Sequence, residues 1–131
     1  MRGTRQRKDA LDELASLLSD IQNYVDVVLV EGVRDVSSLK ALGCKALIEV
    51  LGHSGVGDYD LVEEIASKYN SILILTDFDE EGLNLNQKFS NLLERQGAKV
   101  ETGLRRHVGR LMARIGVYAI ESLDNVMVDL E

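Results

Sequence analysis

Short apolar runs alternate with amphipathic segments along most of the chain. The runs lie at residues 27–30 (VVLV) and 72–75 (ILIL), with weaker ones at 46–50 and 99–102. Runs this apolar indicate strands buried on both faces, as in a parallel sheet. Between and after the runs, apolar residues recur at helical spacing within residues 36–42, 61–69, 85–93 and 104–115. The alternation predicts an α/β fold around a mainly parallel sheet of about four strands, with right-handed crossovers.

The two ends of the chain fall outside this alternation. Residues 8–21 predict an additional amphipathic helix, and residues 118–131 fit either an edge strand or a helix. Proline is absent, and no low-complexity tract or internal repeat marks a boundary. We therefore expect a single domain over residues 1–131, with a core at about 25–102 and a basic helix and tail at about 103–131.

The composition fits a soluble domain. The 131 residues are 45% hydrophobic and 28% charged, and no apolar run approaches the roughly 20 residues of a membrane helix. The single cysteine, Cys44, excludes an internal disulfide, and no cysteine or histidine spacing fits a zinc site. The basic N-terminus lacks the apolar block of a secretion signal. We expect a cytoplasmic protein with no membrane partner.

Acidic side chains follow two of the predicted strands where each strand ends. Glu31 follows the first strand, and Asp77, Asp79 and Glu81 follow the third. Side chains alternate along a strand, and function gathers at the carboxyl ends of parallel strands, so we expect Asp77 and Asp79 to face one pocket with Glu31. All-oxygen ligands suit a hard ion, which predicts a Mg²⁺ site with Mn²⁺ as a substitute. Protonation of one carboxyl is the competing way to relieve the repulsion among these acids.

The same acids also fit a purely structural role. Carboxylates that follow a strand often cap the next helix or lie at its positive N-terminal end. Glu80 and Glu81 taken alone fit this role as well as a ligand role. We favour a site because Asp77 and Asp79 occur together with Glu31 at a second strand end.

Two segments resemble the Toprim domain that topoisomerases, primases and some nucleases share. The segments are VLVEGVRD and ILILTDFDEEG, and the similarity spans roughly residues 25–102. Members of that family carry Glu-Gly after one strand and DxD after another, which correspond here to Glu31 with Gly32 and to Asp77 with Asp79. The resemblance implies a three-layer, Rossmann-like sandwich.

The resemblance also implies roles for individual residues. Glu31 would act as general acid or base, and Asp77 and Asp79 would hold Mg²⁺ with help from Glu81. Asp35 falls where primase-like members have an additional acid. The domains that give topoisomerases their tyrosine and primases their zinc module have no counterpart here, so we expect neither activity from this chain alone. In size and motif the chain is similar to ribosomal-RNA maturation nucleases and most similar to small stand-alone archaeal-type Toprim proteins.

Basic residues supply candidate phosphate contacts, although the formal net charge is −7. Arg106, Arg110 and Arg114 recur every four residues and therefore share one face of the last predicted helix. Arg34 and Lys40 follow the first acidic strand end. A solvated helix face, or pairing with acids elsewhere, explains the three arginines equally well.

A glycine-rich loop follows the second predicted strand at residues 51–58. Its backbone amides are candidates for approaching a phosphate, with His53 and Gly55 as the loop contacts. The loop carries no GxxxxGK[ST] motif, and an ordinary exposed loop accounts for it too.

These observations predict Mg²⁺-dependent phosphoryl transfer on RNA or DNA, in a Toprim-type nuclease or a nuclease component that works with a protein partner. The alternative is a non-catalytic nucleic-acid-binding or adaptor module of an RNA- or DNA-processing complex. A phosphatase that uses the DxD motif as its nucleophile is the third reading. The order of elements argues against it, because in such enzymes the motif ends the first core strand.

Overall fold

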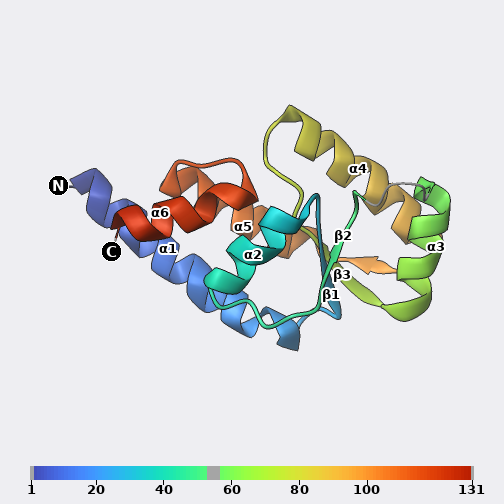
Figure 1. The fold of residues 1–131 in the computed structure, drawn as a ribbon. Helices are drawn as coiled ribbons and strands as arrows, with labels where there is room; N and C mark the ends of the chain where they lie inside the picture. The colour runs from blue at the N-terminus through green and yellow to red at the C-terminus, as the bar shows by residue number, and fades with distance from the viewer. Residues whose placement is uncertain (1, 53–56, 131) are drawn as a thin grey trace.

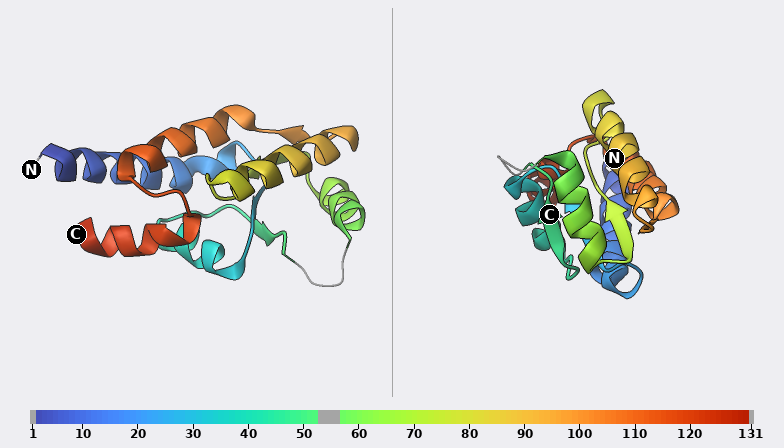
Figure 2. Two further views of the ribbon diagram at one scale, coloured as in Figure 1. Left: turned by 90° about the horizontal axis from the view of Figure 1, so that it is seen from above. Right: turned by 90° about the vertical axis from the view of Figure 1, so that its right-hand side faces the viewer.

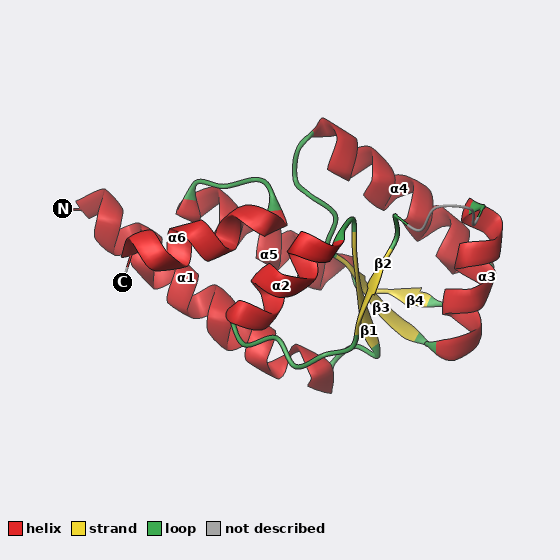
Figure 3. Ribbon diagram, in the orientation of Figure 1, coloured by secondary structure: helices red, strands yellow, loops and turns green. Residues whose placement is uncertain are grey.

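The sheet contains the four strands that the sequence predicts, and all of its strand pairs are parallel. The computed structural model describes residues 2–52 and 57–130 of the chain. Four parallel strands lie in the order β2-β1-β3-β4 (Figures 1 and 3). They are β1 (Val27–Val30), β2 (Ile48–Val50), β3 (Ser71–Ile74) and β4 (Lys99–Val100). The two most apolar runs therefore form the central strands, β1 and β3, which pair with each other.

Helices cover both faces of the sheet, as the sequence predicts for a three-layer α/β sandwich. Figure 3 shows α3 and α4 on one side of the strands and the remaining helices on the other. The helices are α1 (Arg2–Asp20), α2 (Val33–Ala41), α3 (Asp58–Lys68), α4 (Glu80–Arg95), α5 (Thr102–Ile115) and α6 (Leu123–Leu130), with short 3₁₀ turns η1 (Ile21–Asn23) and η2 (Ile120–Ser122). None of the described helices has both the length and the apolar character needed to cross a membrane.

The alternation of side chains along β1 and β3 divides the core into two clusters. Val28 and Leu73 pack on the face covered by α1, α2, α5 and α6. Val27 and Ile72 pack on the opposite face with residues of α3 and α4. All residues of the two central strands are buried except Ser71, the first residue of β3. Their apolar side chains therefore pack against the helices on both faces of the sheet. Because both faces of these strands are buried, neither run contains a polar residue.

The predicted N-terminal helix is present and longer than its apolar stripe indicated. It begins at Arg2 and buries Leu11, Leu14 and Leu18 against the sheet side of the molecule. Figure 2 shows it alongside α5. The Arg7 Nε donates a hydrogen bond of 2.8 Å to the carbonyl oxygen of Ile115 at the end of α5. The first turns of α1 are therefore attached to the end of α5 by Arg7, and the buried leucines follow further along the helix.

The tail, which the sequence left open between strand and helix, is helical. Ile120, Leu123 and Val126 are buried at a spacing of three residues, which fits one helical face and no strand. The tail packs on α2, where Ser38 Oγ donates a 3.0 Å hydrogen bond to the carbonyl oxygen of Glu121. As a result η2 lies next to the carboxyl ends of β1 and β3.

Candidate functional site

A hydrogen bond joins the ends of the two central strands. Glu31 follows β1, and its Oε2 accepts a 2.7 Å hydrogen bond from the backbone N–H of Asp77, three residues after β3. Strand pairing ends with the N–H of Leu75, which donates to the carbonyl of Leu29. Beyond this point the segment is held by contacts outside the sheet: the Glu31 side chain accepts from the N–H of Asp77, and the carbonyl of Tyr118 accepts a 2.8 Å hydrogen bond from the N–H of Phe78. Glu31 and Asp77 are thus brought together at one edge of the sheet.

The two aspartates of the DxD motif hold backbone amides from different elements. The Oδ1 of Asp77 accepts a 2.9 Å hydrogen bond from the N–H of Ile120 in η2. The Oδ1 of Asp79 accepts a 2.8 Å bond from the N–H of Gly82 and caps the N-terminus of α4. Asp79 is exposed, whereas Asp77 is partly buried. Each bond uses one oxygen of its carboxylate, so the helix-capping role holds for Asp79 without excluding a ligand role.

Two further acids lie beside Asp77. Asp35, in the first turn of α2, is buried, and its Oδ2 accepts a 3.0 Å hydrogen bond from the N–H of Gly32. Glu121, in η2, is exposed and close enough to raise the pKa of both Asp35 and Asp77 by repulsion. Glu121 was not anticipated, because nothing in the sequence indicates that the tail folds back over the strand ends.

Burial and mutual repulsion favour protonation of three of these acids. The pKa of Glu31, of Asp35 and of Asp77 is raised in each case, chiefly because burial removes water from the carboxylate. Repulsion from neighbouring acids adds to the shift, and hydrogen bonds from backbone amides oppose it. Raised values of this kind suit a general acid and also suit a site that gains from a bound cation.

A buried arginine supports the acidic cluster from behind. Arg105 of α5 is 6% exposed, and its Nη1 donates to the carbonyls of Ile74 (3.0 Å) and Thr76 (2.9 Å). Its Nη2 donates to the carbonyl of Asp77 at 3.2 Å. Burial lowers the pKa of Arg105 to about 10, while the charges of Glu31 and Asp77 oppose that change. Three carbonyls in one stretch of backbone are therefore held by one guanidinium.

Arg105 also escaped the sequence argument, although a signal for it exists. It lies three residues before Val108 and seven before Met112, both of which are buried, so it occupies the apolar stripe of α5. A charged residue in such a stripe needs a polar partner in the core. The spacing of four residues instead points to Arg106, Arg110 and Arg114 as one face, and all three are exposed.

Close backbone packing fixes the turn between β3 and α4. A Cβ at Gly82 would lie 2.0 Å from the carbonyl oxygen of Asp77, a distance that only a shift of the backbone relieves. The hydroxyl of Thr76 donates a 2.6 Å hydrogen bond to the carbonyl of Gly82. A glycine is therefore required at position 82 because any larger residue would collide with the backbone of Asp77.

The remaining predicted residues lie around this centre. Glu81 is exposed in the first turn of α4 and lines a hollow with Asn84 and Lys88. Arg34 and Lys40 are exposed on α2, and Arg34 lines a polar hollow of about 300 Å³ that also includes Glu121. His53 and Gly55 lie outside the described residues.

The donor set suits Mg²⁺ in chemistry but does not form a closed cage. The side chains that meet here offer only carboxylate oxygens, which are the ligands that Mg²⁺ prefers. Within residues 2–52 and 57–130, no three His, Cys, Asp or Glu side chains converge closely enough to enclose a metal ion. Mg²⁺ characteristically uses one or two carboxylates and keeps several waters. The carboxylates at the strand ends are of the kind that such an open site uses.

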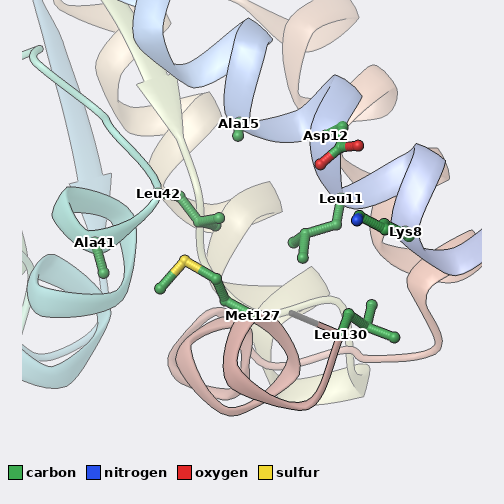
Figure 4. Close-up of a pocket in the computed structure, with 8 residues that line it drawn as sticks. All are labelled: Lys8, Leu11, Asp12, Ala15, Ala41, Leu42, Met127 and Leu130. Atoms are coloured by element: carbon green, nitrogen blue, oxygen red, sulfur yellow. The ribbon is translucent and has the colours of Figure 1, made fainter.

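A separate hollow of about 260 Å³ lies between α1, α2 and α6. Figure 4 shows Leu11, Leu42, Met127 and Leu130 around it, with the charged ends of Lys8 and Asp12 at one side. It contains none of the predicted site residues and lacks the clustered acids of the strand ends.

Comparisons with known proteins agree with the arrangement of strands and acids. A family model for the Toprim domain matches residues 26–108. A UPF0292 protein of Methanosarcina barkeri is 35% identical over 119 residues, which make up 91% of this chain and 81% of that protein. A UPF0292 protein of Pyrococcus horikoshii is 34% identical over 108 residues, or 82% of this chain and 79% of that protein. A solved structure of a protein from Aquifex aeolicus has a TM-score of 0.66 and 27% identity, and covers 84% of this chain and 94% of that one.

Proposed function

Since the chain belongs to the Toprim domain family, we propose that it hydrolyses phosphodiester bonds of RNA or DNA in a Mg²⁺-dependent reaction. Membership in the family by itself suggests only a metal-dependent function connected with nucleic acid. The observation that carries the finer proposal is the hydrogen bond from the Asp77 N–H to Glu31, which ties a carboxyl group of raised pKa to the DxD segment. An acid–base group and candidate metal ligands then occupy one site.

The two kinds of carboxylate take different roles. Asp77 and Asp79 would hold Mg²⁺, and Asp35 is a further acid beside Asp77, whereas Glu81 lines a separate hollow with Asn84 and Lys88. Mg²⁺ held there would offset the negative charge that builds up on the phosphate oxygens. Glu31 handles the proton, either taking it from the attacking water or giving it to the leaving oxygen. A raised pKa supports that role because it brings the carboxyl group closer to neutral pH.

The test is cleavage of labelled single-stranded and duplex RNA and DNA with Mg²⁺ or Mn²⁺. We expect cleavage by the wild type, none by Asp77→Asn/Asp79→Asn, and for Glu31→Gln retained metal binding with loss of turnover. Asp9→Asn/Asp129→Asn is a control that removes two exposed acids on α1 and α6 and leaves cleavage unchanged. Cleavage that survives loss of both aspartates would remove the basis of the proposal.

The adaptor function is the second candidate, and one observation favours it. Asp35, Asp77 and Asp79 each accept a hydrogen bond from a backbone amide, so each already has a structural task. An adaptor would bind nucleic acid or a protein of a processing complex without turnover. Tight nucleic-acid binding that Asp77→Asn/Asp79→Asn leaves intact, together with no cleavage by the wild type, would establish this function instead.

A further inference from the structure

A hollow of about 480 Å³ opens between α4 and α5, directly beside the residue that separates the two aspartates. Phe78, Leu83 and Ala113 give it an apolar lining. Arg106 and Arg110 line the same hollow from α5. Leu83 is 50% exposed, which is unusual for a large apolar side chain and leaves the lining accessible. We call this hollow the α4–α5 groove.

The groove owes its shape to the packing of Phe78 on α5. The Arg105 guanidinium lies 4.2 Å from the centre of the Phe78 ring and covers one of its faces. A Cβ at Gly109 would come within 2.7 Å of Phe78 Cε1, so a glycine is needed for the ring to lie this close to the helix. Phe78 therefore packs on α5 between Arg105 and Gly109, and the groove adjoins the middle residue of the DxD segment.

The two arginines of the groove carry charge that the fold itself does not use. Neither Arg106 nor Arg110 forms an ion pair with any of the residues that the structure describes. They are four residues apart and hence about 6 Å apart along the helix axis, on one face. Arg105, by contrast, spends its hydrogen bonds on the carbonyls of the strand end. The groove thus pairs an apolar lining with two free cations next to candidate metal ligands.

We propose that the α4–α5 groove binds the nucleic-acid strand next to the phosphate that is cleaved. Arg106 and Arg110 contact successive phosphates, and Phe78 and Leu83 accept the apolar face of a sugar or base. The proposal rests on the proposed function for its substrate class. It is compatible with the net charge of −7, because residues 102–120, which include α5, carry four arginines and no acid.

The geometry separates Arg106 and Arg110 from the third arginine of the same face. Arg114 is exposed one turn further along α5 but does not line the groove. If the groove is the contact, loss of Arg114 matters less than loss of either of the other two. If α5 acts only as a diffuse positive surface, the three arginines contribute equally.

The experiment measures the affinity of fluorescein-labelled RNA and DNA oligonucleotides by anisotropy in EDTA, where no metal-dependent cleavage occurs. We expect Arg106→Ala/Arg110→Ala to weaken binding at least tenfold, and to lower the slope of log affinity against log salt by about 2. Leu83→Glu, which keeps both arginines but places a charge in the groove, also weakens binding. Arg95→Ala/Lys45→Ala, which removes two exposed cations elsewhere, is the charge-matched control and has less than a threefold effect.

Circular dichroism of each variant verifies the fold, since all the substituted side chains are exposed. Equal loss of affinity from Arg114→Ala and from Arg106→Ala, or a loss in the Arg95/Lys45 control as large as in the groove variant, would overturn the groove. Unchanged binding in Arg106→Ala/Arg110→Ala would overturn it as well. These results are independent of cleavage: a groove-dependent affinity without turnover would refute the nuclease and leave the groove standing.

Discussion

At the scale of single residues, Arg105 determines how the acidic segment is held. We expect Arg105→Met to lower the free energy of unfolding by about 2–4 kcal/mol, because it leaves the carbonyls of Ile74, Thr76 and Asp77 without their buried donor. Arg105→Lys keeps the charge but replaces a planar fork with a point donor, so its loss is intermediate. Urea unfolding followed by circular dichroism measures both.

The neighbouring Arg106 is the matched control for this stability measurement. It is exposed on the same helix, so Arg106→Met changes the free energy of unfolding by no more than about 0.5 kcal/mol. Equal effects at the two positions would mean that the three carbonyl contacts of Arg105 contribute nothing to the fold.

The burial of Asp35 determines how this residue makes the free energy of unfolding depend on pH. Its pKa is raised in the folded protein above the ordinary 3.8, so the folded state binds this proton more tightly than the unfolded chain. Between the ordinary and the raised value, stability therefore falls as pH rises, and above the raised value the loss is complete. Asp35→Asn keeps an oxygen for the Gly32 N–H and removes the charge, so it flattens this part of the profile.

Urea unfolding in EDTA at closely spaced pH values between 3 and 8, compared between wild type and Asp35→Asn, checks this expectation. Asp26 provides the internal contrast, because hydrogen bonds from the N–H groups of Ser71 and Asn70 lower its pKa. Its contribution is present above its unfolded pKa and is lost as pH falls through the lowered value. A profile that is identical in the two proteins would show that burial of Asp35 has no energetic consequence.

At the scale of elements, the sequence predicted those parts of the fold that depend on local patterns. The strands at 27–30 and 72–75 could be predicted because a strand buried on both faces admits few residues that are not apolar. The helices between them could be predicted from the spacing of their apolar residues. The sequence did not distinguish a strand from a helix in the tail. Which of its apolar residues are buried depends on the surface of α2 on which the tail packs. A contact between distant segments leaves no periodic trace in the sequence.

The candidate site divides in the same way. Glu31, Asp77 and Asp79 could be predicted as candidates because each follows a strand at a motif-like spacing. Glu121 and Arg105 reach the same place from the tail and from α5, and their role depends on the tertiary fold. The polar position within the apolar stripe of α5 was a readable signal for Arg105, whereas Glu121 has none.

Two glycines allow the packing of the turn between β3 and α4 to be tested. In Gly82→Ala the new methyl group meets the carbonyl of Asp77, so we expect a loss of about 3 kcal/mol in the free energy of unfolding. A Cβ at Gly103 in α5 meets nothing within 4 Å, so Gly103→Ala is the control and stabilises by up to about 1 kcal/mol through helix propensity. Chemical denaturation of the two variants gives effects of opposite sign, and a neutral Gly82→Ala would contradict the close approach.

At the scale of the whole molecule, the acidic cluster opposes folding in the absence of a cation. Glu31, Asp35 and Asp77 each have a raised pKa, and the chain as a whole carries a charge of −7. A cation that binds only the folded state stabilises it by mass action, by about 1.4 kcal/mol at ten times its dissociation constant. In a chain of 131 residues that corresponds to a rise in Tm of about 3–6 °C.

Thermal unfolding with Mg²⁺, at an ionic strength matched with NaCl, separates this specific effect from screening. We expect the rise in Tm for the wild type and for Asp9→Asn/Asp129→Asn, and its loss in Asp77→Asn/Asp79→Asn. The metal-free double variant is itself expected to be no less stable than the metal-free wild type, because removing repulsion among neighbouring carboxylates compensates for weaker hydrogen bonds to Ile120 and Gly82. An equal Mg²⁺ effect in all three proteins would place the ion elsewhere on the acidic surface and would separate the strand-end acids from any metal chemistry.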